Sequence, residues 1–443
     1  MKTQGTIKES WPHLLGRRDF LRVGALSYLG LGLSEYFQLS SLMPSETRKK
    51  APAQSCILIW MHGGQSHLDT WDVKGNSGFR PISTNVPGIQ ISELLPRVSK
   101  HMDKLSIIRS MKNESNGHFE GRYYALTGHL PSTKMSFPSV SSIIAKELDT
   151  LTDIPAYVTT SQDQLNCRAA GFVAPQFEPL SIPAPRKKAF KGADLTLPGE
   201  IPVEALQARR SFLDLMDERY RQLQRTAELV TVDAFDERAL NLITSSAVTR
   251  AFDLSQESIK TKEAYGPGRF GQGTLLARRL VEAGCRFVTI DGWNKETNQD
   301  WDTHYRNNYY LKEELVPPLD RALSTLLVDL DERGLFDSTI VLVMGEFGRT
   351  PHINSGRGRD HWGHCWSLVL GGGGVKGGQI VGASDEKGAY VAERLITIGD
   401  LFATIYRALG INWTKTYTGS GCNPIHIANS IGDKQGKPVH ELV

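Results

Sequence analysis

The stretch Thr339-Ile-Val-Leu-Val-Met344 is a run of β-branched and apolar residues, and Gly345-Glu-Phe-Gly-Arg-Thr-Pro351 follows it directly. Such a run predicts a strand that is buried on both faces. Open α/β sheets bind their ligands outside the carboxyl ends of their strands. The stretch therefore predicts an α/β fold with its chemistry at the carboxyl end of this strand, where Glu346 and Arg349 lie.

Strand and helix patterns alternate along the rest of the chain. Apolar runs predict strands at residues 55–61, 105–108, 154–159, 286–290 and 366–370. Apolar spacings of three and four predict helices at residues 139–148, 273–283, 311–333 and 397–409. This alternation predicts a mostly parallel sheet with helices on both faces. Residues 202–265 have the same helical spacing and predict an insert of two or three helices.

The N-terminus carries a targeting pattern. Residues 14–22 read Leu-Leu-Gly-Arg-Arg-Asp-Phe-Leu-Arg, and an apolar run at residues 23–33 follows. This order is typical of a bacterial twin-arginine export signal, and the run is too short and too rich in Gly and Ser to span a bilayer stably. The alternative is an amphipathic helix with a chance arginine pair.

We therefore expect residues 1–45 to be a twin-arginine signal segment and residues 46–443 to form one domain. The export route predicts a periplasmic or cell-envelope location. Because no second long apolar segment occurs, no stable transmembrane domain is expected beyond the signal segment.

Charge and cysteine spacing exclude several classes of protein. The formal net charge of the 443 residues is only +3, and no basic block stands out beyond residues 186–188, so no nucleic-acid partner is expected. The five cysteines are far apart and form no Cys-x-x-Cys, which excludes a zinc ribbon or a redox dithiol. Cys56 and Cys285 lie in predicted strands and are expected to be buried thiols.

Polar residues follow three of the predicted strands. The candidate metal ligands among them are Asp69, Asp72, Asp302, His304, Glu346, His361 and His364. Because the carboxyl ends of parallel strands share one edge of a sheet, we expect these groups to converge. Carboxylates mixed with imidazoles suit Zn²⁺, Mn²⁺ or Fe, whereas carboxylates alone suit Ca²⁺ or Mg²⁺. We expect one or two divalent ions, with zinc, manganese and calcium as candidates.

Each group also has a structural interpretation. Asp69 and Asp72 would cap the turn after the first strand, and residues 294–308 would form a solvated polar loop. Glu346 and Arg349 would form a buried salt bridge that holds their loop. The position of every group at a strand end favours one shared site.

The order of these pieces resembles the alkaline phosphatase/sulfatase superfamily along nearly the whole chain after the signal segment. Sulfatases carry Cys-x-Pro-Ser-Arg followed by Leu-x-Thr-Gly, and this chain has His118-Phe-Glu-Gly-Arg122 followed by Ala125-Leu-Thr-Gly128. Glu346 follows its strand as the superfamily's Ser-Asp-His-Gly or Asp-Asn-Gly does. Residues 302–304 fall where the superfamily has a late Asp and His ligand, and residues 396–411 resemble its Asp-Leu-x-x-Thr-Leu helix.

More narrowly, the chain is similar to a family of twin-arginine-exported bacterial proteins within that superfamily, a family whose function is unassigned. The motifs that carry this similarity are Gly63-Gly-x-Ser-x-x-Asp-Thr-x-Asp-x-Lys74, Leu276-Ala-Arg-Arg-Leu-Val-Glu-Ala-Gly284, Trp301-Asp-Thr-His304, Gly345-Glu-Phe-Gly-Arg-Thr-Pro351 and Arg359-Asp-His-Trp362.

The resemblance implies an exported metal-dependent hydrolase of phosphate or sulfate esters. Its substrate would be an anionic ester, for example of a sulfated or phosphorylated glycan. Arg122 and Arg349 would bind the anionic oxygens, because a guanidinium presents a planar bidentate fork. His118 stands where sulfatases have a formylglycine made from Cys or Ser, so formylglycine chemistry is not expected. His118 would act as nucleophile, general acid/base or metal ligand.

Other interpretations stay open at this point. Ser66, Ser110 and Ser115 are further candidate nucleophiles. A non-catalytic envelope-binding protein would keep the fold, and the missing standard nucleophile favours it. The many charged groups argue against it, because buried charges are costly unless they pair or bind a ligand. A phosphomutase-like enzyme that transfers a phosphoryl group is the third interpretation.

Overall fold

The sheet is built around one buried strand, β1 (Ser55–Trp60). β1 pairs in parallel with β7 (Phe287–Asp291) on one side and with β8 (Thr339–Met344) on the other. Every residue of these three strands is buried. The fully buried strand predicted at residues 339–344 is therefore confirmed.

The computed structural model describes residues 52–148, 153–160, 169–182, 245–292, 300–418 and 424–443. All of them belong to one unit of the chain, Ala51–Val443. The signal segment expected at residues 1–45, its boundary with the domain and residues 202–244 of the expected helical insert lie outside the described residues.

Five further strands complete the main sheet: β4 (Leu105–Met111), β5 (Tyr157–Thr159), β6 (Leu180–Ser181), β11 (Trp366–Gly371) and β12 (Ile380–Val381). The strand order is β12-β4-β11-β8-β1-β7-β5-β6. β11 runs antiparallel to both of its neighbours, whereas all the other pairings in this sheet are parallel. The predicted mostly parallel sheet is confirmed, and β11 is the strand that makes it mixed.

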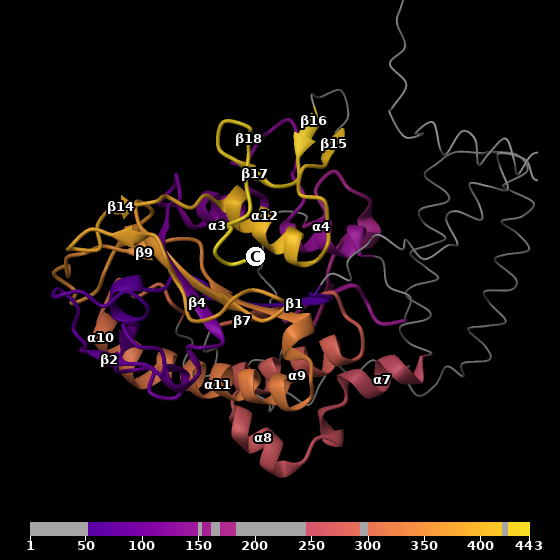
Figure 1. Cartoon of the computed structure of the whole chain (residues 1–443), viewed down its shortest axis with the longest axis horizontal. Coiled ribbons are helices and arrows are strands. Elements are labelled where there is room, and N and C mark those ends of the chain that lie inside the picture. The colour runs from indigo at the N-terminus through magenta and orange to yellow at the C-terminus, as the bar shows by residue number, and fades with distance from the viewer. Residues whose placement is uncertain (1–51, 149–152, 161–168, 183–244, 293–299, 419–423) are drawn as a thin grey trace, which may run out of the picture. The chain divides into compact units, whose positions relative to one another are not determined.

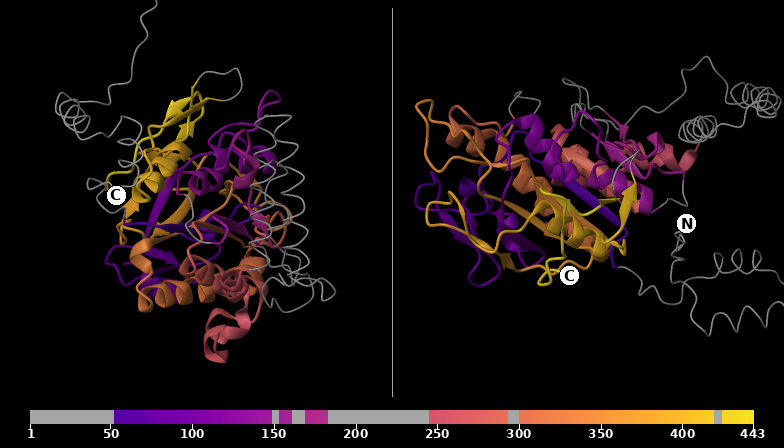
Figure 2. Two further views of the ribbon diagram at one scale, coloured as in Figure 1. Left: turned by 90° about the vertical axis from the view of Figure 1, so that its right-hand side faces the viewer. Right: turned by 90° about the horizontal axis from the view of Figure 1, so that it is seen from above.

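Helices cover both faces of this sheet (Figure 1, Figure 2). One face carries α9 (Arg269–Glu282) and α11 (Val316–Glu332). The other face carries α3 (His118–Thr127), α4 (Val140–Glu147) and α12 (Ile398–Ala408). The prediction of helices on both faces is therefore confirmed.

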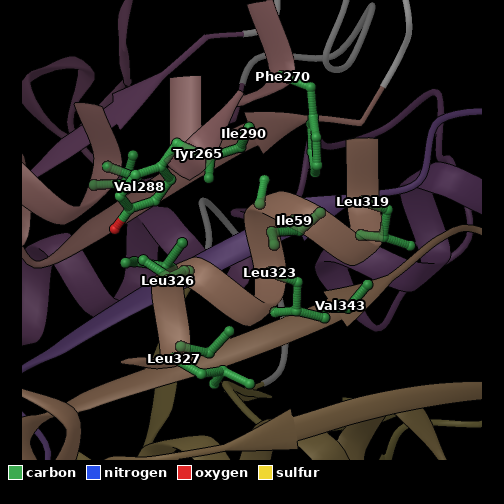
Figure 3. Packing of buried hydrophobic residues seen from close by; sticks show 14 of the residues in the cluster. Ile59, Tyr265, Phe270, Val288, Ile290, Leu319, Leu323, Leu326, Leu327 and Val343 are labelled. Atoms are coloured by element: carbon green, nitrogen blue, oxygen red, sulfur yellow. The ribbon is translucent and has the colours of Figure 1, made fainter. Parts of the chain in front are cut away.

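Two hydrophobic cores lie on the two faces of the sheet, and β1 contributes to both. Ile57 and Ile59 belong to the core shared with α9 and α11. Leu58 and Trp60 belong to the core shared with α3, α4 and α12, because successive side chains of a strand point to opposite faces. Figure 3 shows the first core, in which Ile59 lies among side chains of α11 such as Leu323.

Local signals in the sequence explain where the main helices begin. α12 starts at a capping box, in which Thr397 and the third helical residue bind each other's backbone N–H. The helix predicted over residues 311–333 is a π-helical turn, Leu311–Leu315, followed by α11. The two prolines of α11 directly follow that π-helical turn, and because proline has no N–H to donate, regular α-helical hydrogen bonding is interrupted there.

Shorter elements complete the described part of the chain. The helices are α7 (Ser246–Phe252), α8 (Ile259–Tyr265) and α10 (Asn307–Tyr310). The small antiparallel sheets are β2 (Pro81–Ser83) with β3 (Gln90–Ser92), β9 (Gly348–Arg349) with β10 (His361–Trp362), β13 (Ala383–Ser384) with β14 (Val391–Glu393), β15 (Thr416–Thr418) with β16 (Pro424–His426), and β17 (Asn429–Ser430) with β18 (Lys434–Gln435). α7 and α8 fall in the described part of the predicted insert, which is helical there.

Three cysteines in the described ranges, Cys56, Cys285 and Cys365, are buried free thiols. This confirms the prediction for the first two, whereas Cys167 and Cys422 lie outside the described residues. No helix among the described residues combines the length and the apolar character that crossing a bilayer requires.

The core between α11 and the sheet gives a stability prediction. Leu323 is fully buried, so Leu323→Ala removes packed methyl groups and leaves a cavity. We expect the free energy of unfolding to fall by about 2–5 kcal/mol. The exposed Glu332 on the same helix is the control, and Glu332→Ala should change stability by less than about 0.5 kcal/mol. Urea unfolding checks both variants, and equal effects would contradict the assignment of this core.

Candidate functional site

Five of the polar residues singled out in the sequence, His118, Asp302, His304, Glu346 and His361, meet at the carboxyl edge of the sheet. β1, β4, β7 and β8 run in the same direction, because β11 is antiparallel to both β4 and β8. The segments after these four strands carry His62, His118, Asp302 and Glu346. His361 reaches the same edge from β10, which pairs with β9 so that His361 lies opposite Arg349.

Asp302 is the centre of the cluster. Its Oδ1 lies 3.1 Å from Nε2 of His361, 3.1 Å from Nε2 of His304 and 2.5 Å from Nη2 of Arg349. Its Oδ2 lies 3.2 Å from Nε2 of His118. One carboxylate therefore contacts three imidazoles and one guanidinium.

In two of these imidazoles, the ring nitrogen that faces away from Asp302 forms a hydrogen bond to an oxygen acceptor. Nδ1 of His361 lies 2.7 Å from the carbonyl oxygen of Asn116, and Nδ1 of His304 lies 2.6 Å from Oδ1 of Asp360. Because oxygens of these kinds only accept, each Nδ1 carries a hydrogen, and each Nε2 points toward Asp302. The two Nε2 atoms are 2.9 Å apart. Two imidazole nitrogens and the Asp302 carboxylate therefore converge on one place.

This convergence fits a divalent metal ion. The ligand atoms of His118, Asp302 and His361 all lie within 4.8 Å of one another, and among the described residues this trio meets the spacing that one ion requires. Bonds of 2.0–2.1 Å in a tetrahedral zinc site place the ligand atoms about 3.3 Å apart. Distances near 3.1 Å around Asp302 come close to this value. A carboxylate together with imidazoles suits Zn²⁺ or Mn²⁺ better than Ca²⁺.

Hydrogen bonds that run outward from the cluster hold its imidazoles in place. Metal-binding histidines commonly donate their second N–H to a carboxylate or a carbonyl group. Asp360 does this for His304, and Asn116 does it for His361. Asn116 is itself fixed, since its Oδ1 accepts the backbone N–H of Gly363. The ring orientations are therefore set without a metal ion.

Glu346 is a fully buried carboxylate beside this cluster. Its Oε1 lies 2.9 Å from Nδ1 of His118 and accepts the backbone N–H of Gly63 at 3.0 Å. Its Oε2 is buried without a hydrogen-bond partner among the described residues. Burial raises the pKa of Glu346, but the His118 hydrogen bond and the charges of His62 and Arg122 outweigh it and lower the pKa. The carboxylate is therefore held in its charged form.

His118 lies between the two carboxylates. Burial alone would lower its pKa, but the hydrogen bonds to Asp302 and Glu346 raise the pKa to about 9. Burial raises the pKa of Asp302, but hydrogen bonds from His118 and His361 and the charge of Arg349 hold the pKa far below its usual range. In the absence of a metal ion the cluster therefore holds an imidazolium between two carboxylates at neutral pH.

The two predicted anion-binding arginines have different surroundings. The side chain of Arg349 is fully buried, and it donates to Asp302 and to the backbone oxygens of Gly63, Gly64 and Arg359. Those contacts use most of its N–H groups, so Arg349 fixes Asp302 and the turn after β1. Arg122 lies one helical turn after His118 on α3 and acts through its charge on Glu346.

Three predicted metal ligands lie outside the cluster. Asp69 binds Arg359 at 2.8 Å and also accepts hydrogen bonds from Ser66, Ser77 and Asn307. Asp72 binds Lys74, Arg109 and Ser384. His364 is exposed, and its ring packs against those of Trp362 and Tyr390. The two aspartates therefore have structural contacts, but these are ion pairs and side-chain hydrogen bonds, and the helical turn after β1 has no side-chain cap.

Sequence reasoning missed His62, which directly follows β1. Its Nδ1 lies 3.6 Å from Oδ2 of Asp300. Burial lowers the pKa of His62, but the hydrogen bond to Asp300 and the charge of Glu346 outweigh burial and raise the pKa. Its position at the end of the first strand is the signal that points to it. The supporting roles of Asn116 and Asp360 have no comparable signal, because they depend on which side chains they meet.

Two glycines let the turn after β1 approach the cluster. Gly63 and Gly64 have φ values of 102° and 86°, which other residues rarely adopt. A Cβ on Gly63 would lie 2.4 Å from the backbone nitrogen of Asp302, and one on Gly64 would lie 2.6 Å from the ring of Phe347. The close approach of this turn to Asp302 and Phe347 therefore requires glycine.

The fold and the site together define an α/β protein with a candidate metal centre at the carboxyl edge of a mixed sheet. Residues 53–443 match the family described as "Protein of unknown function (DUF1501)". The chain therefore belongs to the DUF1501 family. No curated protein matches the chain in sequence.

Solved structures to which the chain is similar share little of its sequence. The PsFucS1 sulfatase from Pseudoalteromonas sp. is 11% identical, with a TM-score of 0.40, covering 94% of this chain and 75% of that chain. A protein in the alkaline phosphatase superfamily from Vibrio parahaemolyticus is 11% identical, with a TM-score of 0.40, covering 81% and 67%. The C-terminal periplasmic domain of EcEptC from Escherichia coli, in complex with Zn, is 10% identical, with a TM-score of 0.38, covering 88% and 92%.

The Asp69–Arg359 pair predicts an acid-sensitive contribution to stability. Burial raises the pKa of Asp69, but the charge of Arg359 and hydrogen bonds from two serines outweigh burial and lower the pKa below its unfolded value. The contribution is therefore complete above the unfolded pKa of about 4 and is lost as the pH falls through the lower folded value. We expect Asp69→Asn to cost about 3–5 kcal/mol at pH 7, because it leaves Arg359 buried and unpaired.

Urea unfolding at several pH values checks this prediction. The difference between the wild type and Asp69→Asn should shrink below about pH 4. Asp331→Asn is the control, because that carboxylate is 54% exposed and its ion pair with Lys104 should contribute little. A difference between wild type and Asp69→Asn that stays constant down to about pH 2 would contradict the buried ion pair.

The turn after β1 gives a prediction with a matched control. Gly63→Ala places a methyl group against the backbone of Asp302, whereas Gly88 has a φ of 83° and open space around it. Gly88→Ala therefore reports only the cost of the backbone conformation, about 1–2 kcal/mol. We expect Gly63→Ala to lower the unfolding midpoint clearly further in thermal denaturation. Equal shifts for the two variants would show that Asp302 does not pack against this turn.

Proposed function

We propose that the chain is an exported, metal-dependent hydrolase of phosphate or sulfate esters. The observation that carries the proposal is the convergence of Nε2 of His304, Nε2 of His361 and Oδ1 of Asp302, at mutual distances of 2.9–3.1 Å. Both imidazoles use their Nδ1 for hydrogen bonds that point away from the cluster, so each presents Nε2 to Asp302. Two imidazole nitrogens and one carboxylate oxygen at such distances suit the binding of one shared divalent ion.

Asp302, His304 and His361 would hold the ion, and His118, whose two ring nitrogens face Glu346 and Asp302, would lie beside it. When bound, a divalent ion supplies positive charge for an anionic ester and lowers the pKa of a water molecule. His304 and His361 are already turned toward this place by Asp360 and Asn116. Preorientation of this kind lowers the entropic cost of binding an ion.

Positive side chains near the cluster support an anionic substrate. Arg122 acts electrostatically on Glu346 and His62, so its guanidinium lies in the neighbourhood of the cluster. A guanidinium suits the bidentate recognition of phosphate or sulfate oxygens. Arg349 would keep Asp302 in place, because its N–H groups already bind Asp302 and backbone oxygens.

Export by the twin-arginine route is part of the proposal and rests on the pattern at residues 14–33. That route carries proteins in the folded state, so the metal ion would be acquired before export. A sulfated or phosphorylated glycan of the cell envelope is the substrate class that we propose for such a location.

The metal content of the purified protein tests the metal site. We expect the wild type to contain one or two equivalents of a transition metal by mass spectrometry. His361→Ala and the double variant Asp302→Ala/His304→Ala should lose it, since each removes converging ligands. His364→Ala is the matched control, because His364 is a neighbouring histidine outside the cluster. It should keep the metal content of the wild type.

The metal identified in this way selects the ion for an ester screen with p-nitrophenyl phosphate, phosphonate and sulfate. We expect hydrolysis of at least one ester, a loss of more than about 100-fold in His361→Ala and no loss in His364→Ala. A folded wild-type protein that binds no metal and hydrolyses no ester would overturn the proposal. A non-catalytic envelope-binding protein would then be the leading interpretation.

A further inference from the structure

The cluster also indicates which group attacks the ester. We infer that water attacks the phosphorus or sulfur atom directly, and that His118 is a positioning residue that forms no covalent intermediate. This inference rests on the proposed hydrolase function. It concerns the position in the sequence where sulfatases place their nucleophile, which in this chain is a histidine.

Both ring nitrogens of His118 face carboxylate oxygens. Nδ1 lies 2.9 Å from Oε1 of Glu346, and Nε2 lies 3.2 Å from Oδ2 of Asp302. A ring nitrogen attacks along its lone pair, in the plane of the ring, and a hydrogen bond uses the same direction. The two directions from which His118 would attack are therefore filled by negatively charged groups. These groups would also repel the anionic ester.

The two carboxylates are themselves held firmly. Glu346 is fully buried, and its Oε1 also accepts the backbone N–H of Gly63. Asp302 is fixed by the buried guanidinium of Arg349. A rotation of His118 would leave the buried Glu346 without the charged hydrogen bond that stabilises it, which is costly.

Packing against an aromatic ring holds His118 further. The ring centroid of Phe347 lies 5.2 Å from that of His118 and 4.7 Å from that of His361. Phe347 is fully buried, and the turn at Gly64 closes over it. The imidazole of His118 is therefore confined by side chains as well as by its hydrogen bonds.

The other candidate nucleophiles in the described residues lack an activating partner in the cluster. Ser66 is 1% exposed and donates to Asp69 at 2.6 Å, and Ser110 is fully buried. Ser115 is half-buried, and its Oγ accepts the N–H of Gly117. A serine nucleophile needs a base within hydrogen-bond reach, and neither an imidazole nor a carboxylate of the cluster contacts these three hydroxyls.

The reaction then has one displacement step. The oxygen of a water molecule forms the new bond to phosphorus, and the electron pair of the broken ester bond leaves with the alcohol oxygen. One proton of the water stays on the phosphate product, and the other passes through solvent to the alcohol. For a phosphate monoester, one ester and one water molecule therefore give one alcohol and one hydrogen phosphate. A single displacement inverts the configuration at phosphorus.

A chemical phosphoryl donor tests the attack directions of His118 without any turnover. The full chain, with and without its metal, is incubated with phosphoramidate, and phosphohistidines are located by mass spectrometry. We expect His440, whose side chain is 78% exposed, to be modified and His118 to stay unmodified. Asp302→Ala removes the oxygen that faces Nε2, and His118 should become modified in that variant. Modification of His118 in the wild type to the extent of His440 would overturn the inference.

Two variants separate a positioning role from a nucleophilic one. His118→Asn keeps an N–H group that can donate to Glu346, whereas His118→Ala does not, and neither can form a phosphohistidine. We expect the asparagine variant to retain at least tenfold more activity than the alanine variant. The inference would be overturned by two results together. The two variants would be equally inactive, and wild-type protein incubated with a ³²P-labelled ester would retain an alkali-stable label. A wild type that hydrolyses no ester contradicts the proposed function alone, since the phosphoramidate experiment still decides the role of His118.

Discussion

The buried guanidinium of Arg349 is the group on which the candidate site depends. It joins three segments that are far apart in the sequence, because it binds the carbonyl oxygens of Gly63 and Gly64, that of Arg359 and the carboxylate of Asp302. A fully buried positive charge is tolerated only when its donors are used, and here backbone oxygens and one carboxylate use them. The loops after β1, β7 and β8 are therefore fixed relative to one another before any ligand binds.

Asp302 gains its properties from this arrangement. A carboxylate that contacts three imidazoles and one guanidinium stays ionised at any physiological pH, which its strongly lowered pKa expresses. It can therefore serve as the anionic ligand around which His118, His304 and His361 gather. The cluster resembles metal centres in which outward hydrogen bonds fix each imidazole, and this is the physical basis of the proposed hydrolase function.

A second buried ion pair, between Asp69 and Arg359, links the turn after β1 to the loop that carries His361. Both side chains are fully buried, and Arg359 also donates to the carbonyl oxygens of Thr350 and Pro351. The motifs at residues 63–74 and 359–362 are therefore linked to each other by structure. Asp69 and Arg359 hold these two loops together, whereas His361, two residues after Arg359, contacts Asp302 in the cluster.

The sequence by itself determined the buried strands, the helices between them and the edge of the sheet at which charged residues gather. These features follow from apolar periodicity, which is local along the chain and is recorded in every element. The sequence also singled out Asp302, His304, Glu346 and His361 as polar residues that follow strands, and His118 through the resemblance to sulfatases. The structure brings these five residues together. Only the tertiary structure decided which partner each charge meets.

There is a physical reason why the sequence indicates the elements of the fold but not the partner of each charged residue. Asp69 and Asp302 are both aspartates that follow strands of the same sheet, yet one binds a buried arginine and serines while the other contacts three imidazoles. Partner choice depends on distances of about 3 Å between residues that can be far apart in the sequence, 290 positions for Asp69 and Arg359 and 59 for Asp302 and His361, and periodicity carries no information about such distances. The same holds for His62 and for the antiparallel direction of β11, both of which are set by how the elements pack.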